Sequence, residues 1–314
     1  MSEKISLLVP MYNEEEVVAE FFGVVIPILE ELPVAWEIVC VNDGSRDRTL
    51  DLLLEWNNRD SRIKVINLSR NFGKESAMTA ALDYADGDAV IPIDADLQDP
   101  PGLIPKMVDL WKQGFDVVNA VRSSRESDTR MKRITAKWFY RVINGISNVD
   151  IPPDTGDFRL LSKRACDVLR SMRESRRFMK GLFSWVGFKT TSIEYERKPR
   201  VAGSTKWNYW KLMNLAIEGI TSFSAVPLRI ATYFGVVSAV LSLGYALILV
   251  VDTLIFGNEV KGYSSLMTAV IFFGSVQLIF IGVLGEYVGR IYDEVKRRPI
   301  YVVESVFGLV KNTI

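Results

Sequence analysis

The acidic stretch Asp94-Ala95-Asp96-Leu97-Gln98-Asp99 has the residue types and spacing of a cation site. Residues two apart in an extended turn can direct their oxygens at one point, and two close carboxylates repel unless a cation lies between them. Mg²⁺ uses one or two protein carboxylates and completes its shell with phosphate oxygens and water. The stretch therefore predicts a divalent metal at Asp94 and Asp96. It also fits an Asx turn that caps a helix starting near Pro100.

Two further polar turns each follow a short apolar run. They are Pro10-Met11-Tyr12-Asn13-Glu14 and Asn42-Asp43-Gly44-Ser45. A base and a ribose need polar groups of this kind, and Tyr12 offers a ring for stacking. Each turn alone also fits a helix N-cap, with Asn13 and Ser45 as the capping residues.

Basic residues form two groups later in the chain. The first is Arg122, Arg125, Arg130, Lys132 and Arg133, and the second is Arg197, Lys198, Arg200 and Lys206. A solvated charge run is the usual explanation of such groups. If the metal at Asp94 and Asp96 binds a diphosphate, these basic residues would suit recognition of its phosphates.

The composition of the 314-residue chain narrows the chemistry. There is no histidine, which removes His-based acid–base catalysis, His zinc sites and Ser-His-Asp triads. Any metal must be held by oxygen, which favours Mg²⁺ or Mn²⁺. Lys plus Arg equal Asp plus Glu, at 38 each, so no basic excess indicates nucleic acid as a partner. Cys40 and Cys166 are expected to be reduced thiols.

Short apolar strands alternate with helices over the first 121 residues and would position the three polar turns. Strands are expected at 5–9, 36–41, 63–68, 89–93 and 116–121, with helices at 14–30, 47–57, from Gly73 to about Tyr84, and at 100–113. This alternation predicts an α/β fold with a mainly parallel sheet covered on both faces. Ligands bind at the carboxyl ends of such strands, where all three turns fall.

The following residues contain a second, less regular part of the same domain. An amphipathic helix is expected at 131–146, and a helix with short strands at 162–200. Residues 204–224 combine Trp207, Tyr209 and Trp210 with two lysines, which favours a helix at a membrane interface over a core helix.

Two uncharged segments, 230–251 and 262–285, are each about the 20 residues needed to span a bilayer. Their outer flanks carry the basic residues Lys206, Lys211, Arg229, Arg290, Lys296, Arg297 and Arg298, whereas the connecting loop has one lysine and two acids. The positive-inside rule places both flanks in the cytoplasm. The start of the chain lacks a signal-peptide pattern, so the N-terminal domain is also expected in the cytosol.

Taken in order, these residues resemble the family 2 glycosyltransferases of the GT-A (Rossmann-like) fold. The closest resemblance is to the polyprenyl-phosphate glycosyltransferases, which include bactoprenol glucosyltransferases and dolichol-phosphate mannose synthases. The resemblance covers nearly the whole chain, including the two-span tail. It rests on Asn71-Phe72-Gly73-Lys74-Glu75, Ile91 to Asp99, Gly156-Asp157-Phe158-Arg159-Leu160, Phe178 to Gly181 with Trp185-Val186-Gly187, and Leu284 to Tyr292.

These patterns and the resemblance together divide the chain into four expected parts. They are a cytoplasmic GT-A catalytic domain at 1–203, an interfacial helix region at 204–227, a transmembrane hairpin at 228–290 and a cytoplasmic tail at 291–314. The protein would then be a multi-pass protein of the bacterial cytoplasmic (inner) membrane.

The resemblance also implies the roles of individual side chains. Nucleotide-sugar binding would fall to Pro10, Tyr12, Glu14, Asp43, Lys74, Asp94, Ala95, Asp96 and Gln98. The metal ligands would be Asp94, Asp96 and Gln98. The phosphate or acceptor would be bound by Arg122, Arg159, Arg200 and Lys206. Asp157 matches the position often assigned as the catalytic base, and Asp96 would be catalytic with it.

The implied reaction is inverting transfer of a hexose, with UDP-glucose as the expected donor, to polyprenyl (undecaprenyl) phosphate. The second pKa of a phosphate monoester is about 6, so this acceptor is already anionic near neutral pH. Asp157 is therefore either a base or a group that positions Arg159 or the sugar hydroxyls. The metal would stabilise charge on the leaving diphosphate. GDP-mannose, UDP-N-acetylhexosamine or a UDP-aminoarabinose derivative as donor stays open, as does a homo-oligomer.

Two other classes of protein compete with this interpretation. A processive polysaccharide synthase would carry a Q-x-x-R-W motif and more membrane spans, and the sequence has neither. A membrane-tethered nucleotide-sugar sensor would not need a complete metal site together with Asp157.

Overall fold

The computed structural model describes residues 3–123, 155–175, 177, 179–196, 226–256 and 262–308. The helix expected at 131–146, the interfacial segment at 204–224, Arg200 and Lys206 lie outside the described residues. The elements are β1 (Lys4–Met11), α1 (Val18–Glu30), β2 (Ala35–Asn42), α2 (Thr49–Arg59), β3 (Ile63–Leu68), α3 (Lys74–Tyr84), β4 (Ala89–Pro92), η1 (Pro101–Leu103), α4 (Ile104–Lys112), β5 (Val117–Arg122), β6 (Thr155–Ser162), α6 (Lys163–Ser171), α7 (Met179–Trp185), β7 (Thr190–Tyr195), α9 (Val226–Phe256), α10 (Tyr263–Val295) and β8 (Val303–Phe307).

The five strands expected over the first 121 residues are present, with ends that shift by at most two residues. Each is an apolar run that ends at a polar turn, which is the pattern of a buried strand. The helix expected from Glu14 begins later, at Val18. The reason is local, because the Glu14 carbonyl accepts the N–H groups of both Val17 and Val18 in a tight turn.

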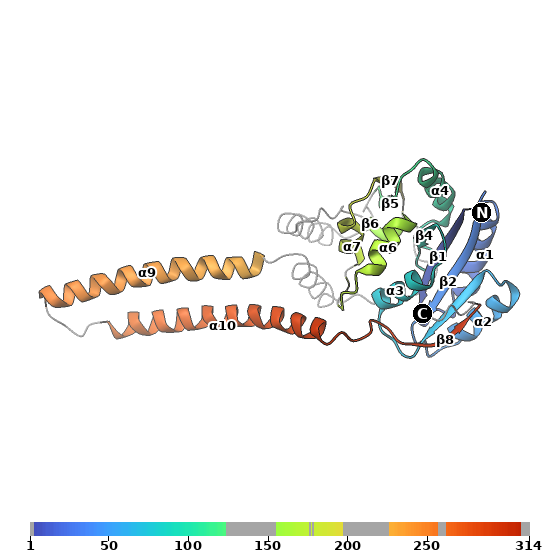
Figure 1. Ribbon diagram of the computed structural model, residues 1–314. Helices are drawn as coiled ribbons and strands as arrows, with labels where there is room; N and C mark the ends of the chain where they lie inside the picture. The colour runs from blue at the N-terminus through green and yellow to red at the C-terminus, as the bar shows by residue number, and fades with distance from the viewer. Residues whose placement is uncertain are drawn as a thin grey trace.

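Within the described part of the chain, eight strands form one mixed sheet in the order β7-β5-β6-β4-β1-β2-β3-β8 (Figure 1). The central strands β4, β1, β2 and β3 are parallel. β6 runs antiparallel to β4 and β5, and β8 runs antiparallel to β3. The carboxyl ends of the central strands lie at one edge of the sheet, and the antiparallel β6 begins at that same edge.

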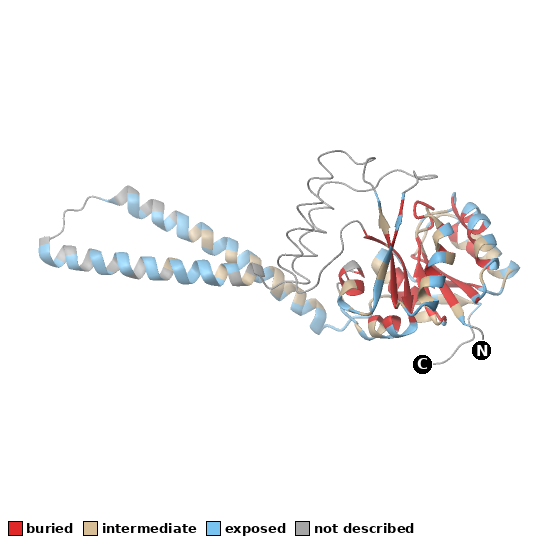
Figure 2. Ribbon diagram, turned by 90° about the horizontal axis from the view of Figure 1, so that it is seen from above, coloured by how far each residue is buried: buried red, intermediate tan, exposed pale blue. Residues whose placement is uncertain are grey.

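Side chains alternate between the two faces of the sheet and form two hydrophobic layers. Cys40 of β2 belongs to the layer that contains Phe21 of α1. The next residue, Val41, belongs to the layer that contains Ala77 of α3 and Cys166 of α6. Both cysteines are free and buried, and Figure 2 shows buried residues concentrated in the sheet domain. The α/β class with helices on both faces is therefore confirmed.

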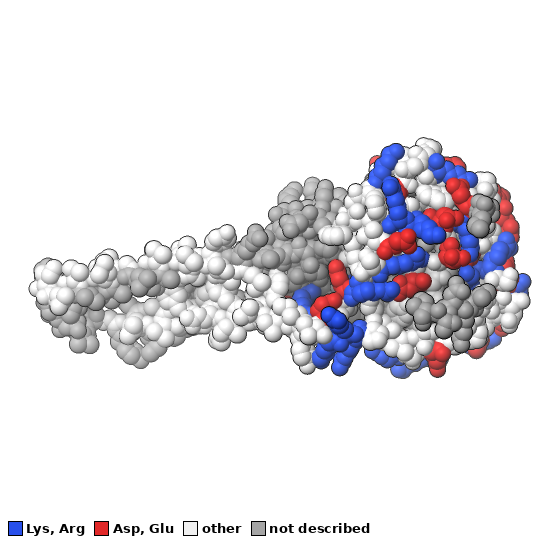
Figure 3. All heavy atoms as spheres, in the orientation of Figure 1, with Lys and Arg blue, Asp and Glu red and all other residues white. Residues whose placement is uncertain are grey.

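α9 and α10 form a long hairpin that extends away from the sheet domain in both views (Figure 1, Figure 2). Its described apolar side chains are mostly exposed, among them Leu241, Leu254 and Leu278. On the face drawn in Figure 3, charged atoms cover the sheet domain and are scarce along the hairpin. An exposed apolar surface of this size marks an interaction or membrane surface. Among the described residues, one segment, Phe272–Val295, is long and apolar enough to cross a membrane.

After α10 the chain returns to the sheet. β8 pairs with β3 in antiparallel register, with Val65 opposite Phe307. The sequence predicted only a cytoplasmic tail at 291–314. A five-residue strand of mixed polarity has too few residues to show a clear period of two, so the pattern did not reveal it.

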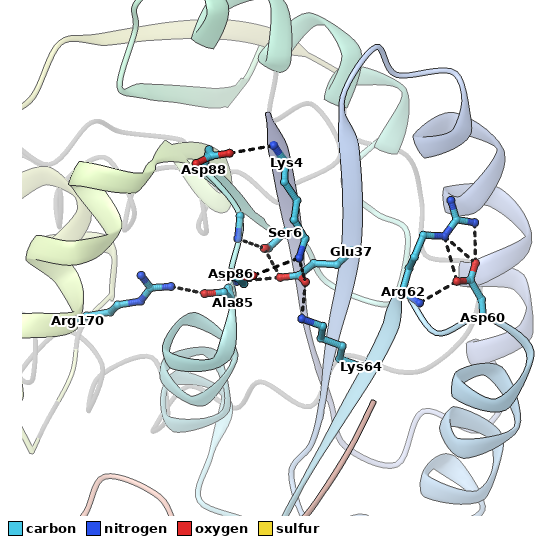
Figure 4. A network of polar contacts seen from close by, with 11 residues as sticks. Lys4, Ser6, Glu37, Asp60, Arg62, Lys64, Ala85, Asp86, Asp88 and Arg170 are labelled. Atoms are coloured by element: carbon cyan, nitrogen blue, oxygen red, sulfur yellow. Dashed lines mark hydrogen bonds and ion pairs between the residues drawn. The ribbon is translucent and has the colours of Figure 1, made fainter. Parts of the chain in front are cut away.

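A buried carboxylate ties together the amino-terminal parts of β1, β2 and β3 (Figure 4). Glu37 on β2 is 1% exposed and contacts Lys4 at 2.5 Å and Lys64 at 2.6 Å. The Ser6 hydroxyl donates to it at 2.6 Å and the Asp86 N–H at 2.9 Å. Burial alone raises the pKa of Glu37, but these four partners outweigh burial and hold the pKa below its ordinary value.

The network predicts an acid-sensitive contribution to stability. Glu37→Gln removes the counter-charge that Lys4 and Lys64 share, although Lys4 keeps a longer contact with the exposed Asp86 at 3.6 Å. The variant should cost about 2–3 kcal/mol, or about 4–8 °C in Tm, at neutral pH. Because the pKa of Glu37 is lowered in the folded protein, its charge stabilises the fold at pH values above the ordinary value of 4.5. This contribution is lost as the pH falls from 4.5 through the lowered pKa of the folded state. The difference in Tm between wild type and variant should therefore shrink below about pH 4.5.

The measurement is thermal unfolding of the full-length protein in detergent across pH. Glu55→Gln is the matched control, because Glu55 forms an exposed pair with Arg59 at 3.6 Å and should change Tm by about 1 °C or less. A Glu37→Gln difference that does not depend on pH would contradict the assignment.

Candidate functional site

Three charged side chains meet at the carboxyl end of the parallel strands. The Lys74 ammonium lies 2.7 Å from Asp94 Oδ1 and 2.7 Å from Asp157 Oδ2. The side chains of Lys74, Asp94 and Asp157 are 44, 33 and 18% exposed, so the cluster is partly open to solvent. A single positive charge thus lies between a carboxylate predicted for metal binding and one predicted for catalysis.

Each member of this cluster comes from a different element. Lys74 is the first residue of α3 and follows Gly73, whose φ of 96° allows a sharp entry into the helix. Asp94 lies two residues after the end of β4, with Ile93 between them. Asp157 lies near the start of β6, and the antiparallel pairing of β4 with β6 places that start beside the end of β4. The fold therefore brings together residues that are 20 and 83 positions apart.

The charges of the cluster depend on one another. Burial raises the pKa of Asp94 and the neighbouring Asp157 adds to the rise, whereas Lys74 opposes it. Burial lowers the pKa of Lys74, but the carboxylates of Asp157 and Asp94 outweigh burial and hold its pKa above the ordinary value. Lys74 stays protonated and serves as an internal counter-ion to both carboxylates.

The turn that follows Asp94 has an uncommon backbone conformation. Leu97 has a φ of 53°, in the left-handed region, at a cost of about 1 kcal/mol or more for a residue other than glycine. The Leu97 side chain is buried in the hydrophobic layer with α1, which stabilises this conformation. Asp96 Oδ1 accepts the Gln98 N–H at 3.2 Å, so an Asx turn is present. It does not cap a helix, because both η1 and α4 begin without a side-chain cap, so the capping part of the alternative is wrong.

The same turn contains oxygen atoms suited to a divalent cation. Asp94 and Asp96 are partly exposed, and Gln98 Oε1 is buried with no hydrogen-bond partner among the described residues. No three acidic or cysteine side chains of the described chain converge to hold a metal alone. A cation held by Asp94, Asp96 and Gln98 would complete its shell with water and phosphate oxygens, and Mg²⁺ typically binds in this way.

A second group of polar side chains lies next to the acidic turn. The Tyr195 hydroxyl at the end of β7 donates to Asp99 Oδ1, and both residues are buried. Burial and the nearby Asp99 raise the pKa of Tyr195 to about 12, although Arg122 opposes the rise. Arg122 ends β5, and its Nε is buried without a hydrogen-bond partner in the described chain. Sequence reasoning missed the Asp99–Tyr195 pair, because nothing in the pattern of β7 marks Tyr195.

Asp43 supports the loop that leads into α3. Its two carboxylate oxygens accept the N–H groups of Phe72 at 2.7 Å and Gly73 at 2.9 Å. Gly44, with a φ of 66°, packs against the same loop, and a Cβ there would lie 2.4 Å from the Arg70 carbonyl carbon. Asp43 therefore helps to place Lys74, and its contact with a nucleoside stays a prediction.

The first polar turn packs against the second. The Asn13 N–H donates to Ser45 Oγ at 3.0 Å, and the Glu14 N–H donates to Thr49 Oγ1 at 2.9 Å. The side chains of Asn13 and Ser45 cap neither α1 nor α2, since both helices begin without a side-chain cap. The N-cap alternative is therefore wrong for these two turns.

Arg159 lies on β6, two residues after Asp157. It is 3% exposed, donates from Nη2 to the Gly156 carbonyl at 2.7 Å and lies 4.2 Å over the Phe183 ring. In this position Arg159 supports the start of β6. Its contact with a phosphate stays a prediction.

Most of the predicted site residues thus lie at one edge of the sheet. At the ends of β1 and β2 are Pro10, Tyr12, Glu14 and Asp43, and around the ends of β4 and β5 and the start of β6 are Lys74, Asp94, Ala95, Asp96, Gln98, Arg122, Asp157 and Arg159. Arg200 and Lys206 fall outside the described residues.

Comparison with protein families places the chain in a known class of enzyme. Residues 6–170 match the model of glycosyl transferase family 2, and residues 226–291 match the GtrB C-terminal hairpin. The chain belongs to glycosyl transferase family 2 and is a glycosyltransferase. The hairpin match, together with the apolar segment Phe272–Val295, indicates association with a membrane.

Individual relatives align with the chain over nearly its full length. It is 51% identical to an uncharacterized glycosyltransferase of Synechocystis sp., covering 98% of this chain and 97% of the relative. It is 50% identical to the SfII prophage-derived bactoprenol glucosyl transferase of Shigella flexneri, and the match covers 96% of this chain and 98% of the relative. A prophage bactoprenol glucosyl transferase homolog of Escherichia coli is also 50% identical, covering 96% and 99%.

Solved structures are more distant. Glucosyl-3-phosphoglycerate synthase from Mycobacterium tuberculosis, solved with Mn²⁺, UDP and glucosyl-3-phosphoglycerate, is 18% identical with a TM-score of 0.47, covering 70% of this chain and 78% of that one. Mannosyl-3-phosphoglycerate synthase from Rubrobacter xylanophilus has the same identity and TM-score, covering 69% and 71%.

The position of Lys74 predicts that its ammonium and a divalent metal compete for Asp94. Lys74→Met should lower the stability of the metal-free protein by about 1 kcal/mol, a modest value because the side chain is 44% exposed. Mg²⁺ or Mn²⁺ should then raise the Tm of the variant more than that of wild type, since the metal replaces the missing charge. Lys74→Arg, which keeps the charge, is the control. Equal metal-induced shifts in all three proteins would exclude this competition.

Proposed function

We propose that this protein transfers glucose from UDP-glucose to polyprenyl phosphate, with inversion at the anomeric carbon. The reaction takes place at the cytoplasmic face of a bacterial inner membrane, which the hairpin spans twice. The donor binds at the polar edge of the sheet, and the acceptor approaches from the hairpin side.

One observation carries the proposal. The similarity to bactoprenol glucosyl transferases, at 50% identity over 96% of the chain, extends through both the sheet domain and the hairpin. A transferase for a soluble acceptor has no need of the hairpin, and a membrane anchor has no need of the charged cluster.

The transfer itself needs little proton chemistry. An oxygen of the lipid phosphate attacks the anomeric carbon while the bond from that carbon to the β-phosphate oxygen breaks, and UDP leaves with the electron pair. A phosphate monoester with a second pKa of about 6 is anionic at neutral pH, so no proton has to leave the nucleophile. Asp157 is ion-paired with Lys74 at 2.7 Å, which favours a positioning role over proton abstraction.

The residues around the acidic turn bind the leaving group. Lys74 supplies positive charge for the diphosphate, and Arg122 Nε, which has no hydrogen-bond partner among the described residues, supplies a donor. Asp94, Asp96 and Gln98 would hold Mg²⁺ or Mn²⁺, which supplies electrostatic stabilisation of the charge that develops on UDP. The turns around Tyr12 and Asp43 would bind the nucleoside.

The direct test uses the full-length protein in detergent with labelled UDP-glucose, a divalent metal and undecaprenyl phosphate. The expected products are UDP and a labelled glycolipid with inverted configuration. Parallel reactions with GDP-mannose and UDP-N-acetylglucosamine test the donor. If a labelled lipid forms only with GDP-mannose or UDP-N-acetylglucosamine, UDP-glucose is not the donor. A product with retained configuration would contradict the proposed inversion in one displacement. A lack of both UDP and glycolipid would indicate a nucleotide-sugar sensor.

Asp96→Asn tests the acidic turn. The variant keeps an acceptor oxygen for the Gln98 N–H but loses the charge that binds a metal, so kcat should fall by about 100-fold or more. Removal of metal with a chelator should abolish wild-type turnover, and added Mg²⁺ or Mn²⁺ should restore it. Asp109→Asn, on the exposed surface of α4, is the control. Wild-type activity in Asp96→Asn, with equal Tm, would remove the metal from this turn.

A further inference from the structure

The strand that follows the hairpin contacts a polar chain inside the sheet. Glu304 on β8 accepts a hydrogen bond from Asn67 Nδ2 of β3 at 2.8 Å, across 237 residues of sequence. Asn67 Oδ1 in turn accepts from Asn42 Nδ2 of β2 at 2.8 Å. Asn42 and Asn67 are register partners and are 1% and 6% exposed, so their amides have little access to water. Their hydrogen bonds must come from this chain of side chains.

The polar chain continues to the turn at Asn42-Asp43-Gly44-Ser45. Asn42 Oδ1 accepts the Ser45 N–H at 3.4 Å. Ser45 Oγ then accepts the Asn13 N–H at 3.0 Å, and Asn13 Oδ1 accepts the Arg46 N–H at 2.9 Å. Asn13 has a φ of 52°, a conformation that needs such support. The two turns at the ends of β1 and β2 are therefore held together by the same bonds.

The direction of these bonds depends on the residue at position 304. An ionised carboxylate only accepts, so Glu304 draws the NH₂ group of Asn67 toward β8 and leaves the Asn67 oxygen facing Asn42. The NH₂ group of Asn42 then faces Asn67, and its oxygen faces the Ser45 N–H. A donor at position 304 would favour the opposite orientation of both amides. That orientation would point the Asn42 NH₂ group at the Ser45 N–H, where two donors meet.

We infer that Glu304 is a positioning residue for donor binding, which acts through Asn67 and Asn42 on the two turns at the ends of β1 and β2. The inference rests on the proposed function, in which these turns bind the nucleoside of the donor. It gives β8 a role beyond closing the sheet edge. The segment that leaves the membrane hairpin sets the hydrogen-bond orientation of the nucleotide site.

The neighbouring residue Tyr301 provides a control from the same segment. Its hydroxyl donates to Asp83 Oδ2 of α3 at 2.7 Å, a contact that involves no residue of the polar chain. Asp83 also pairs with Arg173 at 2.6 Å, so Tyr301→Phe removes one contact of the segment and leaves Asp83 paired. The variant should loosen this attachment without altering Asn67.

The test compares Glu304→Lys, Glu304→Ala, Glu304→Gln and Tyr301→Phe in the full-length protein in detergent. Glu304→Lys should raise the KM for UDP-glucose about tenfold and Glu304→Ala about threefold, with kcat and the KM for the lipid within about twofold of wild type. Glu304→Gln retains an acceptor oxygen without the charge and should restore a nearly wild-type KM. Tyr301→Phe should match wild type.

Hydrogen exchange of the peptide covering residues 42–49, measured without donor, gives a second readout that does not require turnover. Exchange there should increase in the order wild type, Glu304→Gln, Glu304→Ala, Glu304→Lys, while β3 and β8 stay protected. Unchanged exchange at 42–49 in Glu304→Lys would overturn the inference. Exchange that rises equally across β3 and β8 would also overturn it, because that result means loss of the strand. If wild type does not use UDP-glucose, the proposed donor fails, and the exchange measurement still decides the role of Glu304.

Discussion

The contact of Lys74 with Asp94 and Asp157 is the constraint around which the sheet domain is arranged. Two carboxylates at one sheet edge are stable only with a positive charge between them, and that charge must come from an element that ends at the same place. α3 meets this need because it starts at Lys74, and its start is fixed by the carboxylate of Asp43. Antiparallel β6 meets it from the other side by placing Asp157 where β4 ends. The adjacent positions of α3, β4 and β6 thus bring the three charges together.

The opposite part of the sheet solves a similar problem in a different way. Glu37 is a single buried carboxylate between Lys4 and Lys64, with every partner supplied by the protein. At the functional edge, by contrast, Gln98 Oε1 and Arg122 Nε are buried without partners among the described residues. The amino-terminal end of the sheet thus has a carboxylate that is neutralised by ion pairs within the protein. The partly open cluster at the other end has polar atoms of the kind that the proposed donor site would use.

Much of this arrangement could be predicted from the sequence, and the reasons for the rest are physical. The strands before Asn42 and Asp94 are strongly apolar and end at polar turns, so the pattern located both the elements and the site edge. The roles of Asp43 and Arg159 were harder to foresee, because whether a charged residue faces a ligand or supports a loop depends on packing between distant segments. β8 and the role of Tyr195 were not predicted for the same reason, since their importance comes from partners such as Asn67 and Asp99 that lie far away in sequence. Family resemblance supplied Lys74 and Asp157, which periodicity alone would not have joined.

The length of the hairpin helices has a consequence for the distance between the reaction and the lipid. α9 and α10 contain 31 and 33 residues, which correspond to about 46 and 50 Å of helix. The hydrocarbon layer of a bilayer is about 30 Å thick, and about 40–45 Å with its headgroup regions. Both helices are thus long enough to cross the headgroup regions as well as the hydrocarbon. In the proposed orientation, the sheet domain would lie just above the headgroups, and a lipid phosphate at that height would reach the site without leaving its leaflet.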